Sequence, residues 1–433
     1  NLGGTADTVR ISETYTLPTS DGTNGQVLTT NGSGVVTFAD AGGGADLYAA
    51  ETTGSTNPTA SGTLSIAIGS SAIATGNNSI AIGNGADVFN SWTGAVAIGP
   101  NSGANGAYSV AIGEGTNTYS GTTGSLAIGQ SAQAVSQYCV AIGRARASQQ
   151  SSFAAVIDNN TSSYGTSGTN SIAIGYQAKA EGGTNGSVAI GYNAHATTRE
   201  AVAIGSSAYA DGSGSVALGG YFGTSVQARA TGTASFAVAG YNGLANRDST
   251  AAGLSSIALA GGYAQQSQSV AIGAFAHANV RGKVAWSSYP LTYVNGVTQA
   301  GNYVLSNSTT DATATVLVTD YEWATPSTIN QVVLPNNSCY GFTGTVIARE
   351  NSIATNDFAV WEIKGGAVRA ASASTTALGT YNINKISESA GAANWSIALS
   401  ADTTNGAVAI TVTGEASHNI RWVATVNTTE VTY

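Results

Sequence analysis

The chain of 433 residues is only 9% charged and contains 56 glycines, six prolines and no methionine. Because it has no stretch rich in Glu, Lys and Leu, it is predicted to be nearly all β. Its net charge of −9 argues against the basic stripe of a nucleic-acid-binding protein, and no apolar run approaches the roughly 18 residues of a membrane helix. Neither nucleic-acid binding nor membrane insertion is therefore expected.

The N-terminal segment, residues 1–60, carries short β-prone runs separated by turn pairs such as Asp21-Gly22 and Asn31-Gly32. Such pairs favour tight hairpins. The stretch Leu17 to Asp40 resembles a linker module, Leu-Pro-x-x-Asp-Gly-x-x-Gly-Gln-Val-Leu-x-Thr-Asn-Gly, of bacteriophage tail-fibre proteins. The resemblance implies attachment to other phage tail or baseplate proteins. A purely structural β-rich shoulder beside the next domain fits the residues equally well.

A pentapeptide, Ser/Ala-Val/Ile-Ala-Ile/Leu-Gly, recurs through the second predicted domain, residues 61–282. Its closing glycines are spaced 14 or 16 residues apart, for example at Gly69, Gly83, Gly99 and Gly113. A fixed period this short indicates a solenoid of strands. Two strands and two turns fill one period, so each repeat is predicted to form one coil of a parallel β-roll. About fourteen coils would make a rod of roughly 65–70 Å.

Alternation along the first strand places Val110 and Ile112 on one face and Ala111 on the other. We predict that the branched residues face the coil interior and that the middle alanine packs against a neighbouring chain. The residues assigned to the roll core and to trimer packing are Ile68, Ile82, Ile98, Val110, Ala111, Ile112, Ile128, Ile142, Ile174, Ile190, Ile204 and Ile272.

The second strand of each coil has small residues two positions apart, such as Ala132 and Ala134, with a freely varying residue between them. That residue must face water. It is Lys179, His195 or His277 in different coils, and the outward positions are expected to hold no aromatic cluster.

A roll with alanine on one inner wall has almost no interior, so lateral association with other chains is predicted. The repeat resembles the left-handed parallel β-roll head of trimeric autotransporter adhesins, whose repeats read like Asn-Ser-Val-Ala-Ile-Gly. The resemblance covers about residues 62–280 and implies left-handed winding and a homotrimer.

Two irregularities of the roll carry little chemistry. Cys139 takes the place of the usual Ser or Ala and lies far from Cys339 in the chain, so the two are expected not to form a disulfide. Asp158-Asn159-Asn160 interrupts the repeat and predicts an irregular coil with a protruding loop, where a partner could bind.

The third predicted domain, residues 283–433, contains five of the six tryptophans: Trp286, Trp323, Trp361, Trp395 and Trp422. Alternating runs near 331–334, 343–348, 358–363, 395–399, 408–412 and 420–426 predict an antiparallel β-sandwich of jelly-roll type. The segments 330–338, 399–406 and 413–426 resemble the C-terminal domain of phage tail-fibre and related virion proteins. The resemblance implies a virion location and a domain that caps the fibre.

Residues typical of catalysis or metal binding are scarce. His195 and His277 occupy the outward position of the roll, and His418 has no Cys, Asp or Glu at ligand spacing. Glu350, Asp357 and Glu362 are interpreted as solvated acids. We therefore expect no catalytic, cofactor-binding or metal site, and no enzyme; a polysaccharide depolymerase is a distant third possibility.

Two functions remain. The first is a phage tail fibre that combines a spacer rod with recognition of a host receptor, glycan or protein. The second is the head of a bacterial autotransporter adhesin on the cell surface. That family requires a heptad stalk, a membrane anchor and a basic neck, of which Arg281 and Lys283 are at most a remnant, so the phage hypothesis is favoured. We expect residues 286–433 to form the distal, host-contacting tip; a purely structural cap is the alternative.

Overall fold

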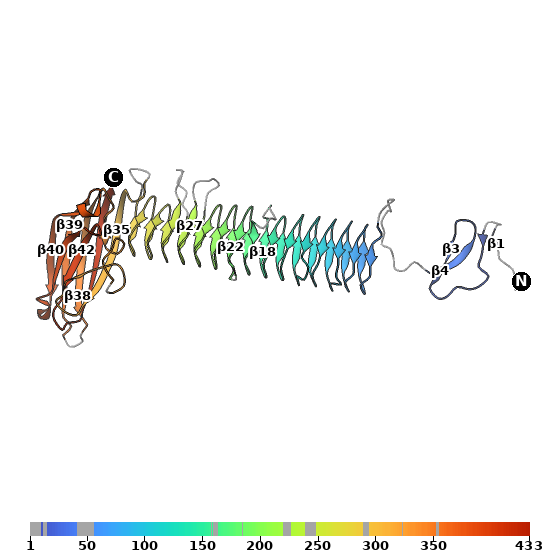
Figure 1. The fold of residues 1–433 in the computed structure, drawn as a ribbon, viewed down its shortest axis with the longest axis horizontal. Coiled ribbons are helices and arrows are strands. Elements are labelled where there is room, and N and C mark those ends of the chain that lie inside the picture. Colours follow the sequence, from blue (N-terminus) through green and yellow to red (C-terminus); the bar gives the residue numbers. More distant parts are fainter. Residues whose placement is uncertain are drawn as a thin grey trace.

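The computed structural model describes residues 10–11, 15–40, 56–156, 158, 163–183, 185–219, 227–238, 248–288, 294–322, 324–351 and 355–433. Within these ranges all elements are strands except two short 3-10 helices, η1 (Ala373–Thr375) and η2 (Ala390–Ala392). They form an N-terminal hairpin segment, a long parallel roll and a C-terminal sandwich (Figure 1). The expected all-β architecture is confirmed. Asn159, Asn160 and Trp323 lie outside the described residues.

The N-terminal segment contains two antiparallel strand pairs. β1 (Arg10–Ile11) pairs with β2 (Tyr15–Thr16), and β3 (Gln26–Thr30) pairs with β4 (Val36–Asp40). The Asn31 side chain closes the second turn by accepting hydrogen bonds from the backbone N–H groups of Ser33 and Val35, at 2.9 and 3.1 Å. The hairpin predicted at Asn31-Gly32 is thus present.

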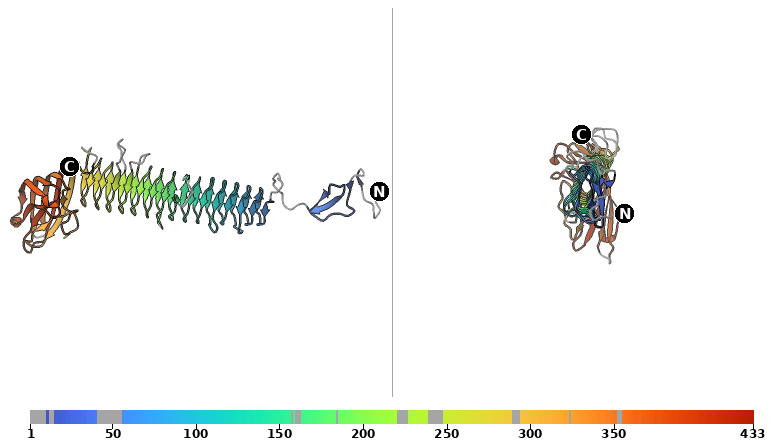
Figure 2. Two further views of the ribbon diagram at one scale, coloured as in Figure 1. Left: turned by 45° about the horizontal axis from the view of Figure 1, so that its top comes forward. Right: turned by 90° about the vertical axis from the view of Figure 1, so that its right-hand side faces the viewer.

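The roll consists of two parallel sheets that face each other, with one strand of each sheet in every coil (Figure 2). The first sheet contains β6 (Ile66–Ile68), β8 (Ile80–Ile82), β10 (Val96–Ile98), β12 (Val110–Ile112), β14 (Leu126–Ile128), β16 (Val140–Ile142), β18 (Phe153–Ala155), β20 (Ile172–Ile174), β22 (Val188–Ile190), β24 (Val202–Ile204), β26 (Val216–Leu218), β28 (Phe236–Val238), β30 (Ile257–Leu259), β32 (Val270–Ile272) and β34 (Val284–Trp286).

The second sheet has 15 strands. They are β5 (Thr59–Ala60), β7 (Ile73–Ala74), β9 (Asp87–Val88), β11 (Gly103–Ala104), β13 (Asn117–Thr118), β15 (Gln133–Ala134), β17 (Arg146–Ala147), β19 (Gly165–Thr166), β21 (Lys179–Ala180), β23 (His195–Ala196), β25 (Tyr209–Ala210), β27 (Ala228–Ala230), β29 (Ser249–Ala251), β31 (Tyr263–Ala264) and β33 (His277–Ala278). The repeat thus builds the predicted parallel solenoid.

The pairing register stacks equivalent residues of successive coils. Ala97, Ala111 and Ala127 lie opposite one another on β10, β12 and β14. The closing glycines also stack. At Gly99, whose φ is +123°, an added Cβ would lie 2.7 Å from the backbone oxygen of Gly113. Glycine is therefore needed both for its conformation and for the close approach of the next coil.

The predicted facing of the first sheet is wrong. Ala111 is completely buried in the coil interior, whereas Val110 and Ile112 lie half-buried on the outer face. The same inversion holds for the other branched residues assigned to the core, namely Ile68, Ile82, Ile98, Ile128, Ile142, Ile174, Ile190, Ile204 and Ile272.

The physical reason is the width of the coil. Both sheets line the interior with small side chains, nearly all of them alanine, that are completely buried. A branched side chain has no room there. The second strand is as predicted: Ala132 and Ala134 are buried, while Gln133 between them points outward.

The C-terminal domain is an antiparallel sandwich, as predicted. One sheet has the order β35 (Thr298–Thr309), β43 (Ile420–Thr432), β38 (Ser338–Glu350), β39 (Phe358–Arg369) and β40 (Ala377–Glu388). The other joins β36 (Thr315–Val316), β37 (Val332–Val333) and β41 (Ser396–Asp402) to β42 (Ala407–Thr413). Each predicted run overlaps an observed strand, whereas β35, β36 and β40 were missed.

The core of the sandwich is aromatic. The rings of Trp361 and Trp395 lie 5.6 and 6.0 Å from that of Trp422, and all three residues are buried. Trp286, in contrast, is 45% exposed and ends β34, the last strand of the roll. The roll therefore extends to Trp286 rather than to residue 282.

Candidate functional site

One candidate interaction surface is a stripe along the outer face of the first sheet of the roll. Each strand contributes two outward residues, such as Val202 and Ile204 on β24. Ile204 and Ile272 are 40% and 41% exposed. The register places the outward residues of adjacent strands opposite one another, as for Ile190, Ile204 and Leu218, so the stripe continues from coil to coil. We call this surface the apolar stripe. Continuous exposed apolar surface of this kind marks an interaction site.

A second ordered surface lies on the outer face of the second sheet. Tyr209 lies between His195, at a ring distance of 5.6 Å, and the Arg229 guanidinium, which is 5.1 Å from the ring centre. Tyr263 and His277 stack at 5.1 Å. The expectation that the outward positions hold no aromatic cluster is therefore wrong. The signal was present, since these residues occupy the same repeat position in nearby coils.

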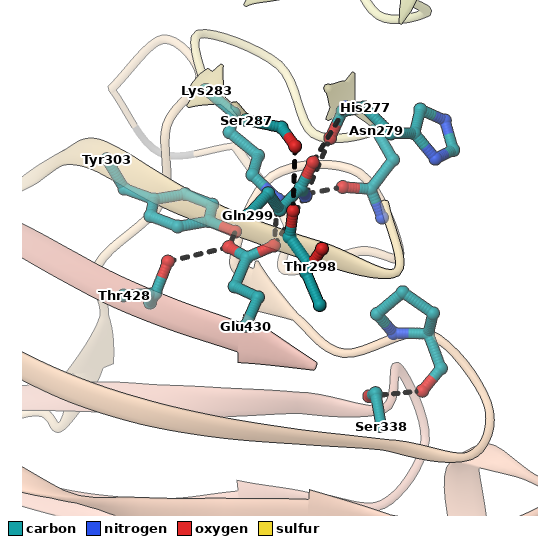
Figure 3. A network of polar contacts seen from close by, with 11 residues as sticks. His277, Asn279, Lys283, Ser287, Thr298, Gln299, Tyr303, Ser338, Thr428 and Glu430 are labelled. Atoms are coloured by element: carbon teal, nitrogen blue, oxygen red, sulfur yellow. Dashed lines mark hydrogen bonds and ion pairs between the residues drawn. The ribbon is translucent and has the colours of Figure 1, made fainter. Parts of the chain in front are cut away.

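The junction between roll and sandwich is built around a buried ion pair (Figure 3). Lys283 Nζ, from the last turn of the roll, donates to Glu430 Oε2 of β43 at 2.8 Å, and both side chains are fully buried. Lys283 is therefore a component of the junction. The repeat pattern gave no indication of its partner, 147 residues away.

The remaining lone pairs of Glu430 are also used. Gln299 Nε2 donates to Oε2 at 2.6 Å, while the hydroxyls of Tyr303 and Thr428 donate to Oε1 at 3.2 and 2.6 Å. Complete hydrogen bonding is the condition under which a buried ion pair is tolerated. The arrangement fixes β43 and β35 to the end of the roll.

Gln299 also closes the edge of the second sheet. Its side-chain oxygen accepts a hydrogen bond from the His277 N–H at 2.7 Å, and its nitrogen donates to the His277 carbonyl at 3.1 Å. The amide thus pairs with β33 as the backbone of a further strand would. Covering an edge in this way prevents the addition of another strand.

Burial shifts the pKa values of the ionisable groups at the junction. Burial lowers the pKa of Lys283, while Glu430 opposes this change. For Glu430 burial acts to raise the pKa, but the Lys283 charge and the hydrogen bonds outweigh it and leave the pKa lowered. Burial, together with the Lys283 charge, lowers the pKa of His277 to about 4. Near neutral pH the His277 ring is therefore neutral.

A polar hollow of about 650 Å³ lies on the five-stranded sheet of the sandwich. Its lining includes Thr343, Lys364, Tyr381, Asn382 and Asn427. These side chains combine amide, hydroxyl, ammonium and aromatic groups, which together can bind a polar ligand.

The acids and histidine considered as chemical candidates do not form one site. His418 Nδ1 lies 2.9 Å from Glu350 Oε1, a contact that sequence spacing missed. Asp357 instead accepts a hydrogen bond from Ser389 Oγ at 2.6 Å, and Glu362 is exposed on β39. Across the described ranges, no group of three or more His, Cys, Asp or Glu residues is arranged to bind a metal.

The cysteines are free, as predicted. Cys139 is buried in the roll and donates to the Ser136 carbonyl at 2.7 Å, whereas Cys339 is exposed on β38. Of the loop predicted at residues 158–160, only Asp158 is described; it lies 3.6 Å from Arg144 in an exposed ion pair. No helix in the described part of the chain is long and apolar enough to cross a membrane.

Comparison with protein families gives one match, the YadA head domain repeat, at residues 60–86, 93–116, 123–145, 167–194, 185–207 and 199–221. These matches fall on the coils of the roll and leave the sandwich and the N-terminal hairpin unmatched. The comparison with curated proteins gives no match. The roll is thus similar to an adhesin head repeat, which supports a structural or adhesive role at an extracellular surface.

Proposed function

We propose that the chain forms a homotrimeric, non-enzymatic adhesive fibre in which the roll is a spacer rod. The observation that carries this proposal is the apolar stripe outside a core made almost entirely of alanine. Burying an alanine methyl contributes much less than burying a Val or Ile side chain. Covering the stripe therefore supplies stabilisation that the coil interior cannot, and three copies packed around one axis cover it on each chain.

Sedimentation equilibrium on the intact protein tests this assembly. We expect the mass of three chains at micromolar concentration, and a loss of trimer for Ile204→Asp, which adds one charge per chain to the stripe. Lys179→Asp on the outer face of the second sheet is the matched control and should leave the trimer intact. A wild-type protein that sediments as a monomer would contradict the proposal.

The setting that we propose is the tail fibre of a bacteriophage, with the N-terminal segment toward the particle and the sandwich at the distal tip. The linker-like stretch Leu17 to Asp40 supports this setting. The head-repeat similarity fits a bacterial surface adhesin equally well. Immunogold electron microscopy with antibodies against the chain distinguishes the two, because label on virion tails supports the first and label on bacterial cells supports the second.

Host recognition is assigned to the sandwich, with a purely structural cap as the alternative. The polar hollow of the sandwich offers the mixed chemistry that supports this assignment. Binding of the labelled full chain to host cells should fall when Lys364 and Tyr381 are replaced together by alanine. Loss of binding for Tyr209→Ala instead, with no change for the sandwich variant, would transfer recognition to the roll.

A further inference from the structure

The first sheet of the roll and the five-stranded sheet of the sandwich are one continuous sheet. β34 pairs antiparallel with β35, and the register places Ala285 opposite Gly301 and Trp286 opposite Ala300. Ala285 and Gly301 are both buried, whereas Trp286 is exposed. Since side chains alternate between the two faces of a sheet, the outer face of the five-stranded sheet is the same face that carries the apolar stripe.

This outer face carries a second set of exposed apolar residues. Val423, Ile347 and Val360 lie directly opposite one another on β43, β38 and β39. Val423 and Ile347 are 44% and 48% exposed, and Val304 and Phe358 extend the set on β35 and β39. We call these five residues the apolar band. Its residues come from four neighbouring strands, so it is a surface patch rather than scattered apolar positions.

The opposite side of the sandwich differs. The exposed residues of β41 on its outer face are Ser396, Ala398 and Ser400, all of them small. Arg421 and Arg349, which lie opposite each other in the register, border the band on β43 and β38. An apolar centre with arginine at its rim is the usual composition of a protein interface.

We infer that the apolar band is the sandwich's part of the trimer contact and packs against other copies of this chain. The inference rests on the proposed trimer. Three chains that bring their apolar stripes together around an axis along the roll also turn the same face of the same sheet toward that axis. The apolar band of each chain then lies closest to the apolar band of a neighbouring copy. The polar hollow lies on the same five-stranded sheet, so the recognition proposed there requires that its lining stay outside this contact.

Site-specific cross-linking of the full chain tests the inference. In a Cys139→Ser/Cys339→Ser background, single cysteines are introduced as Ile204→Cys in the stripe, Ile347→Cys in the band and Ala398→Cys on the opposite side. A short bis-maleimide is then added and the products are separated on a denaturing gel. We expect cross-linked chains for Ile204→Cys and Ile347→Cys, with at least a fivefold lower yield for Ala398→Cys.

The outcomes separate the two proposals. Cross-linking at residue 204 but not at 347 overturns the inference and leaves the trimer standing; a glycan or protein ligand would then be the occupant of this face. A monomeric mass with no cross-link at either position overturns both. Equal yields at 347 and 398 indicate random collision and also overturn the inference. Val423→Cys, directly opposite Ile347, repeats the test if Ile347→Cys does not fold.

Discussion

The junction ion pair predicts unequal effects for the removal of its two partners. After Lys283→Met, the Glu430 carboxylate keeps the hydrogen bonds from Gln299, Tyr303 and Thr428. After Glu430→Leu, the Lys283 ammonium keeps a long hydrogen bond to Asn279, at 3.3 Å, and its positions over the rings of Tyr303 and Tyr340. Three neutral donors also lose their acceptor.

Removing one partner of a buried pair costs about 3–5 kcal/mol, and each orphaned neutral donor adds about 1–3 kcal/mol. We therefore expect Lys283→Met to lower the free energy of unfolding by about 3 kcal/mol and Glu430→Leu by clearly more than 5 kcal/mol. The loss for Lys283→Met should shrink as the pH falls, because Glu430 can then take up a proton.

Urea unfolding of the full chain, followed by the fluorescence of the clustered tryptophans of the sandwich, measures both losses. The matched control is Lys179→Met, which breaks a partly exposed pair with Glu181 of nearly the same length, 2.9 Å; such pairs contribute only about 0–1 kcal/mol. Equal losses for Lys283→Met and Glu430→Leu, or a Lys283→Met loss as small as that of the control, would refute the reasoning.

Three further predictions follow from the roll and the junction. Ala111 is completely buried, so Ala111→Leu should lower the free energy of unfolding by about 1–3 kcal/mol or more through overpacking. The control Lys179→Ala should change it little. Equal melting temperatures of the two variants in calorimetry would mean that the coil interior has room for a larger side chain. Gly106→Ala should melt lower than Gly341→Ala, because an added Cβ meets a backbone oxygen at 1.5 Å at the first position and open space at the second, and neither glycine has a positive φ. His277 has a folded-state pKa of about 4 against 6.5 for the free group, so the unfolded chain takes up the proton first as the pH falls. The free energy of unfolding should therefore fall by about 3 kcal/mol between pH 6.5 and pH 4. In urea titrations, His277→Gln should remove most of this pH dependence.

The period of the repeat was sufficient to predict the roll, but it did not show which face of the first sheet points into the coil. The alternation of side chains shows that Val110 and Ile112 share a face, but not whether that face points into the coil. Assigning the wrong face to the interior reverses every side chain of the strand. The width of the coil decides, and that width is limited by the short period of the repeat and by the alanines of the second strand. Both features were visible in the sequence, so the correct orientation could have been derived by asking which side chains fit.

The junction could not be predicted from local sequence. Lys283 and Glu430 lie in different domains, and neither has a pattern around it that indicates burial or a partner. β35 was missed for a related reason: its sequence, TQAGNYVLSNST, is rich in Asn, Ser and Thr, which are typical of loops. The strand forms because Tyr303 and Leu305 face the core and because β34 and β43 supply hydrogen-bond partners on both sides.

The distribution of side chains between the inside and the outside of the coil determines how the fibre is stabilised. Inside a coil, Ala111 and its equivalents remove only methyl groups from water, whereas the branched residues that bury more area lie outside. In the proposed trimer, much of the hydrophobic stabilisation of the roll is therefore gained only when chains associate. A trimer built in this way unfolds and dissociates in one step, since a released chain exposes its stripe in every coil, and its resistance to dilution then depends on the barrier to that step.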